Sequence, residues 1–277
     1  HLRAAPAAGY RFAGWAGFDG ATSDSITLVL TTDVHLTARV EVDNAASDRF
    51  PAAYPLSTGS YRFTEWQSER PRGSFPESMA FVQGANRDPL LQDALDSYWT
   101  LPDNLNNRTR ISGLGRGGIA FINTSDPAPD GQGGYLGAAI LALNTMGQTR
   151  VFAIWTAGTI TPNARPYAIR LQYRIGSMGT FLDVLDPSGR PVEYTSHGLA
   201  GHSETYGPVL LPDSFNGKPY AQLRWKYYSL SQVFDGPRAQ LRLDDILITS
   251  SSTEKPGFLE WIRTQFPAQN EGAISSG

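Results

Sequence analysis

The sequence predicts an all-β protein whose main part is an antiparallel jelly-roll or β-sandwich domain. Apolar and polar residues alternate along stretches such as Ser25–Leu30 and Tyr167–Ile175, and this period is typical of half-buried strands. Turn signals such as Asp186–Gly189 and Asn216–Gly217 separate the stretches, and Gly (28) and Pro (19) are plentiful. Many short strands at close spacing favour a sandwich or jelly roll.

Composition narrows the class further. The chain has 277 residues, 40% of them hydrophobic and 18% charged, so it can bury a core without disulfides. Cysteine is absent, which excludes disulfides, thiolate metal sites and cysteine catalysis. The net charge of -3 and the lack of a Lys/Arg block predict no nucleic-acid partner. No apolar run approaches the ~20 residues that cross a bilayer.

Residues 1–42 are predicted to form a small β unit, and residues 43–60, which contain two prolines and little periodicity, a linker. Within the unit, the stretch "LRAAPAAGYRFAGWAG", a polar turn and "ITLVLTTDVHLTARVEV" resemble the later half of an internalin-type B repeat, a bacterial surface repeat. The family's first strands have no counterpart here, so we expect the chain to begin inside a repeat. The incomplete unit would then offer an open edge for strand pairing with another chain.

Residues 61–250 are predicted to form the β-sandwich, interrupted by a short helix at Leu90–Trp99. The expected strands are Tyr61–Gln67, Ser78–Gln83, Gly118–Asn123, Gly137–Asn144, Arg150–Thr156, Tyr167–Ile175, Thr180–Leu185, Tyr220–Tyr228 and Gln240–Thr249.

Several stretches of this domain resemble a large jelly-roll module of secreted surface proteins of Verrucomicrobia- or Planctomycetes-type bacteria. They include "YAIRLQYRIGSMGTFLDV", "GHSETYGPVLLP" and "LRWKYYSLS". The resemblance implies an extracellular or cell-surface location and carries no activity to transfer. Residues 251–277 form a tail in which Phe258, Trp261, Ile262 and Phe266 suit one face of a short helix.

Aromatic side chains are the first candidates for a ligand site, because sugar rings stack on flat side chains. We predict Trp66 and Trp99 as contacts. In "RWKYY", neighbouring side chains face opposite ways, so with Trp225 in the core we expect Lys226 and Tyr228 to be outside and available. For any single aromatic residue, packing in the core is the competing interpretation.

A calcium ion is the predicted cofactor. Asp244 and Asp245 are neighbours in the last expected strand, so one of them points inward and needs a partner or a metal. Asp43 and Asp48 lie near the start of the main domain and could complete a set of hard oxygen ligands. The alternative is that an arginine such as Arg242 neutralises the inward carboxylate.

Catalytic patterns are weak. Glu65 and Glu69 come nearest to the carboxylate pair of a glycosidase, but strand-end acids are the simpler interpretation. His197 and His202, with Glu204 nearby, have two glycines in the same segment, which favours a polar loop over a metal site. His1 could chelate copper only with a second histidine. Ser203 lacks a nucleophile elbow, and the Gly-rich run 113–118 lacks a phosphate-loop context.

We therefore expect a non-catalytic extracellular binding module of a larger surface protein, with a polysaccharide or cell-surface glycan as its partner. Two alternatives remain open. One is a structural spacer, or a filament or sheath component, with no small ligand. The other is a polysaccharide-active hydrolase or lyase, which needs either two acids about 5–10 Å apart or a cluster of Tyr, His and Arg side chains in a cleft. An aromatic patch with polar neighbours would distinguish the binding module from the spacer.

Overall fold

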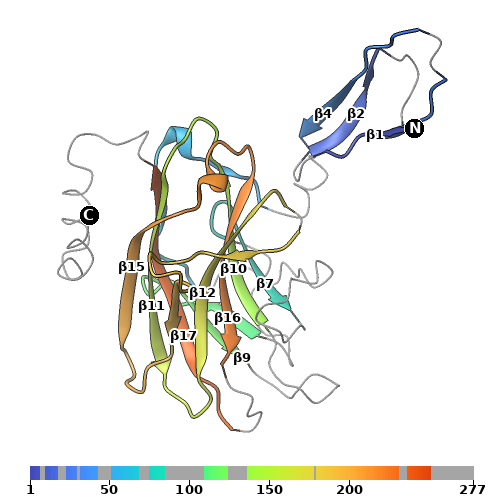
Figure 1. Ribbon diagram of the computed structural model, residues 1–277. Coiled ribbons are helices and arrows are strands. Elements are labelled where there is room, and N and C mark those ends of the chain that lie inside the picture. Colours follow the sequence, from blue (N-terminus) through green and yellow to red (C-terminus); the bar gives the residue numbers. More distant parts are fainter. Residues whose placement is uncertain are drawn as a thin grey trace.

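The chain folds into a β-sandwich preceded by a small N-terminal β unit (Figure 1). The computed structural model describes residues 1–6, 10–17, 23–29, 32–42, 51–68, 75–84, 109–123, 136–177, 179–230 and 236–250. Within these ranges the helical elements are the single 3₁₀ turns η1 (Leu56–Thr58) and η3 (Asp213–Phe215). No helix in the described ranges is long and apolar enough to span a membrane.

The first sheet is built around three long antiparallel strands, β12, β16 and β10, which lie side by side. Shorter strands complete it at both edges, and all pairs are antiparallel except β5 with β10. Its strands are β13 (Leu182–Asp183), β14 (Glu193–Thr195), β12 (Tyr167–Ile175), β16 (Ala221–Ser229), β10 (Leu136–Asn144), β7 (Met79–Gly84) and β5 (Tyr54–Pro55).

The second sheet is antiparallel throughout, with β11 and β17 at its centre. The register between them shifts where Asp245 adopts a φ of 49°, so β17 bulges at this point. The strands are β15 (Ser203–Leu210), β11 (Val151–Thr161), β17 (Gln240–Ser250), β6 (Tyr61–Phe63), β9 (Ile119–Asn123) and β8 (Thr109–Gly113).

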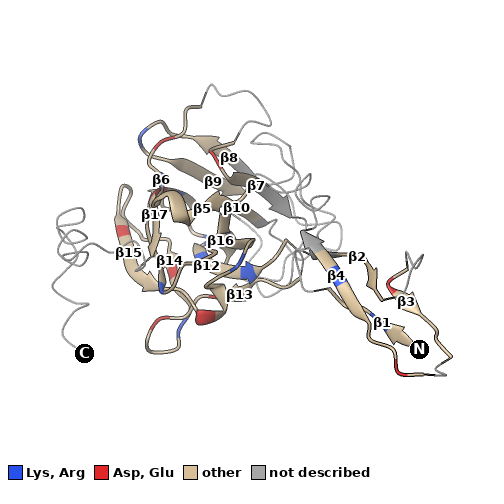
Figure 2. Ribbon diagram, turned by 90° about the horizontal axis from the view of Figure 1, so that it is seen from above, with Lys and Arg blue, Asp and Glu red and all other residues tan. Residues whose placement is uncertain are grey.

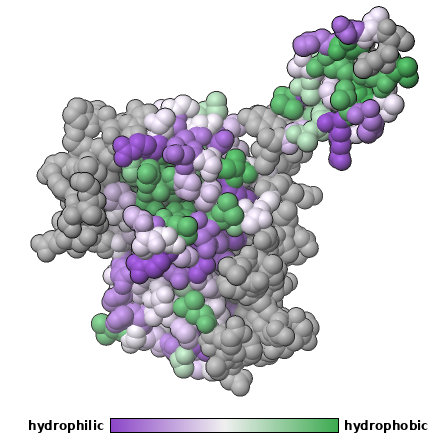
Figure 3. Space-filling model, in the orientation of Figure 1, coloured by the Kyte–Doolittle hydropathy of each residue, from purple (hydrophilic) through white to green (hydrophobic). Residues whose placement is uncertain are grey.

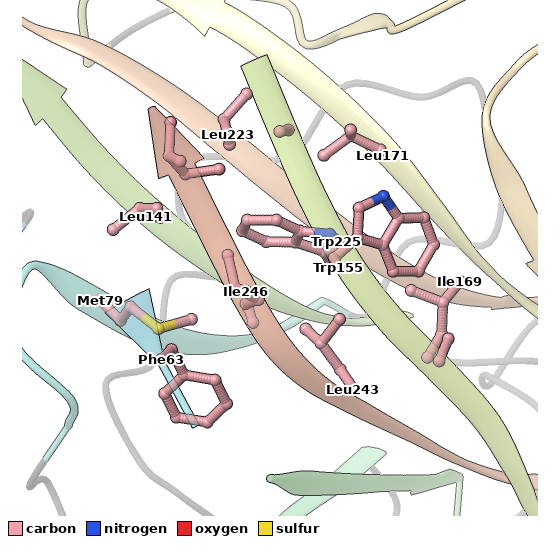
Figure 4. Close-up of a cluster of buried hydrophobic side chains, with 14 of the residues drawn as sticks. Phe63, Met79, Leu141, Trp155, Ile169, Leu171, Leu223, Trp225, Leu243 and Ile246 are labelled. Carbon is pink, nitrogen blue, oxygen red and sulfur yellow. The ribbon is translucent and has the colours of Figure 1, made fainter. Parts of the chain in front are cut away.

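The core lies between the two sheets and takes alternate side chains from both. Trp155 of β11 and Trp225 of β16 are fully buried near its centre (Figure 4). At one end, the ring of Tyr227 stacks between Tyr167 and Phe121, with centroid distances of 4.6 and 5.6 Å. Burial of so many aromatic and aliphatic side chains is the main force that holds the sheets together.

The N-terminal unit consists of two separate two-stranded ribbons (Figure 2). β1 (Leu2–Arg3) pairs with β3 (Ser25–Ile26), and β2 (Tyr10–Ala16) pairs with β4 (Thr37–Val42). In the described part of this unit, only Ala4 and Ile26 are buried apolar side chains. Ribbons of two strands with so little buried surface are marginally stable in water.

The predicted all-β sandwich is confirmed, and Tyr167–Ile175 is a strand over the expected residues. Other expected strands are present with shifted ends; Thr180–Leu185, for example, is reduced to β13. The edge strands β5, β8, β14 and β15 were not predicted, and β5 lies within the expected linker 43–60. The expected helix at Leu90–Trp99 and the helix in 251–277 both lie outside the described residues.

Candidate functional site

A cavity of about 400 Å³ opens at one edge of the sandwich, where the first sheet meets the second. It lies between the β12–β13 hairpin on one side and the end of β15 with the η3 turn on the other. We call it the edge cavity. Its lining residues are Tyr173, Asp183, Leu185, Leu210, Leu211, Pro212 and Asp213.

The apolar part of the edge cavity combines one aromatic ring with exposed aliphatic side chains. Tyr173 is half-buried and packs edge-on against Phe215, with ring centroids 6.2 Å apart. Leu185 and Leu210 are 50% and 46% exposed, which is unusual for two leucines at the rim of one cavity. Figure 3 shows hydrophobic and hydrophilic residues next to one another on this face of the sandwich.

Two carboxylates, Asp183 and Asp213, line the same cavity. The first is held in place: one of its oxygens accepts a hydrogen bond from Arg170 at 2.9 Å, and the other accepts one from Gln172 at 2.7 Å. Each carboxylate oxygen has a further lone pair, so both can still accept hydrogen bonds from a ligand. Asp213 lies on η3 and is exposed. The cavity therefore presents fixed acceptors beside apolar surface.

A hydrogen-bonded network extends from Asp183 across the outer face of β12, β14 and β16. Arg170 donates to Glu193 at 2.8 Å as well as to Asp183, and the hydroxyl of Tyr228 donates to Glu193 at 2.5 Å. Burial lowers the pKa of Arg170, but the hydrogen bond to Glu193 and the nearby carboxylates outweigh it and raise the pKa above its ordinary value. We call this set, together with Gln172 and Arg224, the outer-face network.

Phe181 covers the neighbouring part of the same sheet face. Its ring lies against the guanidinium groups of Arg174 and Arg224, at 4.2 and 4.1 Å from the ring centroid. Beneath it, Arg224 donates to Gln172 and Arg174 donates to Gln222. These polar side chains are at most 3% exposed, so cation–π contacts and hydrogen bonds take the place of water.

The expected exposure of Lys226 and Tyr228 is wrong. They are 0% and 2% exposed, although they do lie on the face opposite Trp225, as the alternation predicts. Lys226 lies 5.2 Å from the ring centroid of Tyr228, whose hydroxyl is committed to Glu193. Because this sheet is covered on both faces, residues pointing away from the core are also removed from water. Neither side chain presents a surface on which a sugar could stack.

Trp66, another of the four predicted ligand contacts, is half-buried. Its ring packs edge-on against Phe81 with centroids 6.2 Å apart, and its backbone bridges to Gly115. It therefore contributes to packing beside the core and lies apart from the edge cavity lining. Trp99 lies outside the described residues.

Asp244 and Asp245, the predicted calcium ligands, occupy the bulge in β17. Asp244 is buried and accepts a hydrogen bond from Arg242 at 2.9 Å. Burial is the largest cause that raises the pKa of Asp244, to about 6, and burial also raises the pKa of Asp245. Asp43 and Asp48 lie outside the described residues. Within the described ranges no three His, Asp or Glu side chains converge on a metal position, so calcium stays a prediction.

The histidine loop forms a hydrogen-bonded cluster. The rings of His197 and His202 stack with centroids 3.9 Å apart, and His202 contacts the hydroxyl of Tyr194 at 3.1 Å and Glu204 at 3.7 Å. The backbone N–H of Leu199 donates to His197. This agrees with the polar-loop interpretation. His1 contacts Thr27 at 3.1 Å.

Of the remaining catalytic candidates, Glu65 is exposed and Glu69 lies outside the described residues. The Gly-rich run forms the turn between β8 and β9, where Gly118 has a φ of +75°. A Cβ at Gly118 would lie 2.1 Å from the carbonyl oxygen of Leu243, so close approach to β17 requires glycine there.

The N-terminal residues 1–43 match the family model of the divergent InlB B-repeat domain, which confirms the predicted B repeat. No curated protein matches the chain. The solved structures to which part of the chain is similar include two xylan- or family 22-type carbohydrate-binding modules and a galactotriose-bound one.

A xylan-binding module, CBM15, is 9% identical and has a TM-score of 0.34, over 70% of this chain and 98% of that one. The C-terminal family 22 carbohydrate-binding module of Clostridium thermocellum Xyn10B is 15% identical, with a TM-score of 0.30 over 70% and 96%. TmCBM61, solved in complex with β-1,4-galactotriose, is 7% identical, with a TM-score of 0.28 over 53% and 73%. Likenesses at this distance transfer no ligand, so function has to be argued from the site itself.

Proposed function

We propose that the sandwich is a non-catalytic carbohydrate-binding module of an extracellular surface protein, and that a sugar unit of a polysaccharide docks in the edge cavity. The observation that carries this proposal is the composition of the cavity. A sugar ring has an apolar C–H face and a rim of hydroxyl groups. The edge cavity offers a tyrosine ring and exposed leucines for the first, and the carboxylates of Asp183 and Asp213 for the second.

Size and rigidity support the same function. A volume of about 400 Å³ is at the small end of the range for small-molecule sites, so it suits one or two sugar units. Asp183 is already oriented by Arg170 and Gln172 before any ligand arrives. A preorganised acceptor loses less conformational entropy on binding, which favours affinity. The B repeat at the N-terminus supports a place in a larger surface protein.

The proposal is tested by presenting the full chain to a broad polysaccharide and glycan array, followed by calorimetric titration of each glycan that binds. We expect Asp213→Asn and Leu210→Ala each to weaken binding about tenfold or more, which corresponds to about 1.4 kcal/mol. Asp24→Asn is the matched control, because Asp24 is an exposed aspartate paired with Arg3 in the N-terminal unit. Unchanged affinity in both cavity variants would show that the sugar-binding site lies elsewhere.

Each titration is repeated with calcium and with a chelator. Calcium-dependent binding supports the proposed ion at Asp244 and Asp245, whereas equal affinity in both buffers removes calcium from the ligand site. Failure to bind any glycan in either buffer would favour the structural spacer.

A polysaccharide hydrolase is the second candidate, because two carboxylates line one cavity. The same samples are therefore assayed for released reducing ends. If the unaltered chain releases reducing ends and the Asp213→Asn variant does not, the non-catalytic assignment is overturned. Binding without release of reducing ends supports it.

A further inference from the structure

Arg165 lies in the turn between β11 and β12, at the other end of β12 from the edge cavity. Its backbone is fixed by the segment that leads into β17. The N–H of Arg165 donates to the carbonyl of Pro237 at 3.2 Å, and its carbonyl accepts from the N–H of Ala239 at 3.1 Å. The side chain therefore starts from a well-determined position at the end of the core.

Two nitrogens of the Arg165 guanidinium are buried and unsatisfied. The residue is 2% exposed, and neither Nε nor Nη1 has a hydrogen-bond partner among the residues that the structure describes. Arginine stays protonated in proteins, so this side chain does not escape the cost of burial by losing its charge. Buried charges are ordinarily paired or hydrogen-bonded, because an unpaired one is strongly destabilising. This makes Arg165 unlike Arg170, which is paired with two carboxylates.

A second positive charge lies close by. Arg165 and Arg238 are partners in a parallel β-bridge, so their backbones are adjacent. Burial raises the pKa of Tyr227 well above its ordinary value, while the charges of both arginines act on the same hydroxyl in the opposite direction. That hydroxyl donates to the carbonyl of Ala239 at 2.7 Å. At this end of the core the backbones of two arginines therefore lie side by side.

We propose that Arg165 binds a small inorganic anion such as chloride. An anion would accept hydrogen bonds from the buried N–H groups of Arg165 and neutralise its charge. Because Arg165 is only 2% exposed, we expect the site to admit a small ion and to exclude a large one. The site is independent of the proposed sugar cavity, which lies at the opposite end of β12.

Thermal unfolding of the full chain tests the proposal. Sodium chloride replaces sodium gluconate at constant ionic strength, because gluconate is too large to enter. Once the chloride concentration exceeds the Kd of the site, we expect the Tm to rise by roughly 3–5 °C for each tenfold increase in chloride. Arg165→Met should lose this response. Arg190→Met is the matched control, because Arg190 is an exposed arginine on a turn, and it should keep the response.

A second measurement needs no variant. Crystals of the unaltered chain grown or soaked in bromide should show an anomalous peak beside the Arg165 guanidinium. An equal chloride response in the unaltered chain and in Arg165→Met would refute the proposal, since the effect would then be general to the salt. The lack of a peak at this guanidinium in high bromide would refute it as well.

Discussion

The two faces of the sheet formed by β12, β16 and β10 are both buried, yet their side chains differ in chemistry. On β16, Leu223 and Trp225 point into the core between the sheets, whereas Arg224 and Lys226 point the other way and are equally removed from water. The inner face is held by contact area, which has no preferred direction. The outer face is held by directed pairs, such as the two hydrogen bonds from Arg224 to Gln172.

This difference teaches what each face tolerates. An apolar face responds to lost volume, because a cavity forms where atoms are removed. A hydrogen-bonded face responds to a lost partner, because the remaining polar group stays buried and unsatisfied. The contrast also bears on where a ligand could bind. Asp183, whose side chain is 21% exposed, belongs to the outer-face network and also lines the edge cavity.

The largest expected effect comes from breaking the inner face. Trp225→Ala removes a fully buried indole at the centre of the core and should lower the free energy of unfolding by about 3–5 kcal/mol. Urea denaturation followed by circular dichroism measures this loss. Trp66→Ala is the comparison, because Trp66 is only half-buried beside the core and should cost clearly less. Equal losses for the two variants would contradict the assignment of Trp225 to the centre.

The sequence predicted the alternation on β16 correctly and its consequence wrongly. From "RWKYY" alone, period two assigns Trp225 to one face and Lys226 to the other, and this holds. That the second face is also covered depends on residues distant in sequence. Phe181, for example, lies over Arg224 at 4.1 Å. Local patterns contain no information about such a cover.

The edge cavity was missed for a similar reason. Asp183 and Asp213 are separated in sequence and meet because the β12–β13 hairpin and the end of β15 lie at the same edge. β15 was not predicted, since its glycine, proline and polar residues are typical of a loop. The Arg-x-Gln-x-Arg alternation at Arg170–Arg174 was the available signal for a polar sheet face.

A carboxyl group of the second sheet allows a pH-dependent test of how buried polar groups differ from the buried apolar core. Asp244 is adjacent to the core residue Leu243 on β17 and so points away from the core, where burial raises its pKa to about 6. The folded state therefore binds more protons than the unfolded state between pH 4 and 6. The contribution of the Asp244 carboxyl to the free energy of unfolding is greatest below pH 4 and is lost as the pH rises through about 6.

Two pKa units correspond to at most about 3 kcal/mol over that window. The measurement is urea denaturation at several values from pH 4 to pH 7, with Asp244→Asn as the reference. Asn cannot titrate, so the difference between the two proteins isolates this carboxyl from all the others. We expect the unaltered chain to lose stability relative to the variant as the pH rises. A difference that is constant with pH would show that Asp244 titrates normally.

The smallest expected effect tests whether the covered outer face differs from open surface. Tyr228 and Tyr206 each donate to a glutamate, at 2.5 Å to Glu193 and 2.7 Å to Glu204. Glu193 belongs to the outer-face network and also accepts from Arg170, whereas the side chain of Glu204 is 50% exposed. Replacing either tyrosine by phenylalanine removes one hydroxyl and keeps the ring.

Tyr228→Phe should lower the free energy of unfolding by about 1–2 kcal/mol, because Glu193 keeps its arginine but loses a charge-assisted hydrogen bond that water does not fully replace. Tyr206→Phe should cost less than about 0.5 kcal/mol, since water reaches Glu204 and substitutes for the hydroxyl. Parallel urea titrations compare the two variants directly. Equal losses for the two variants would mean that water reaches the outer face of β16 as freely as it reaches β15. The two faces of the sheet that contains β16 would then differ only in the type of residue that they carry.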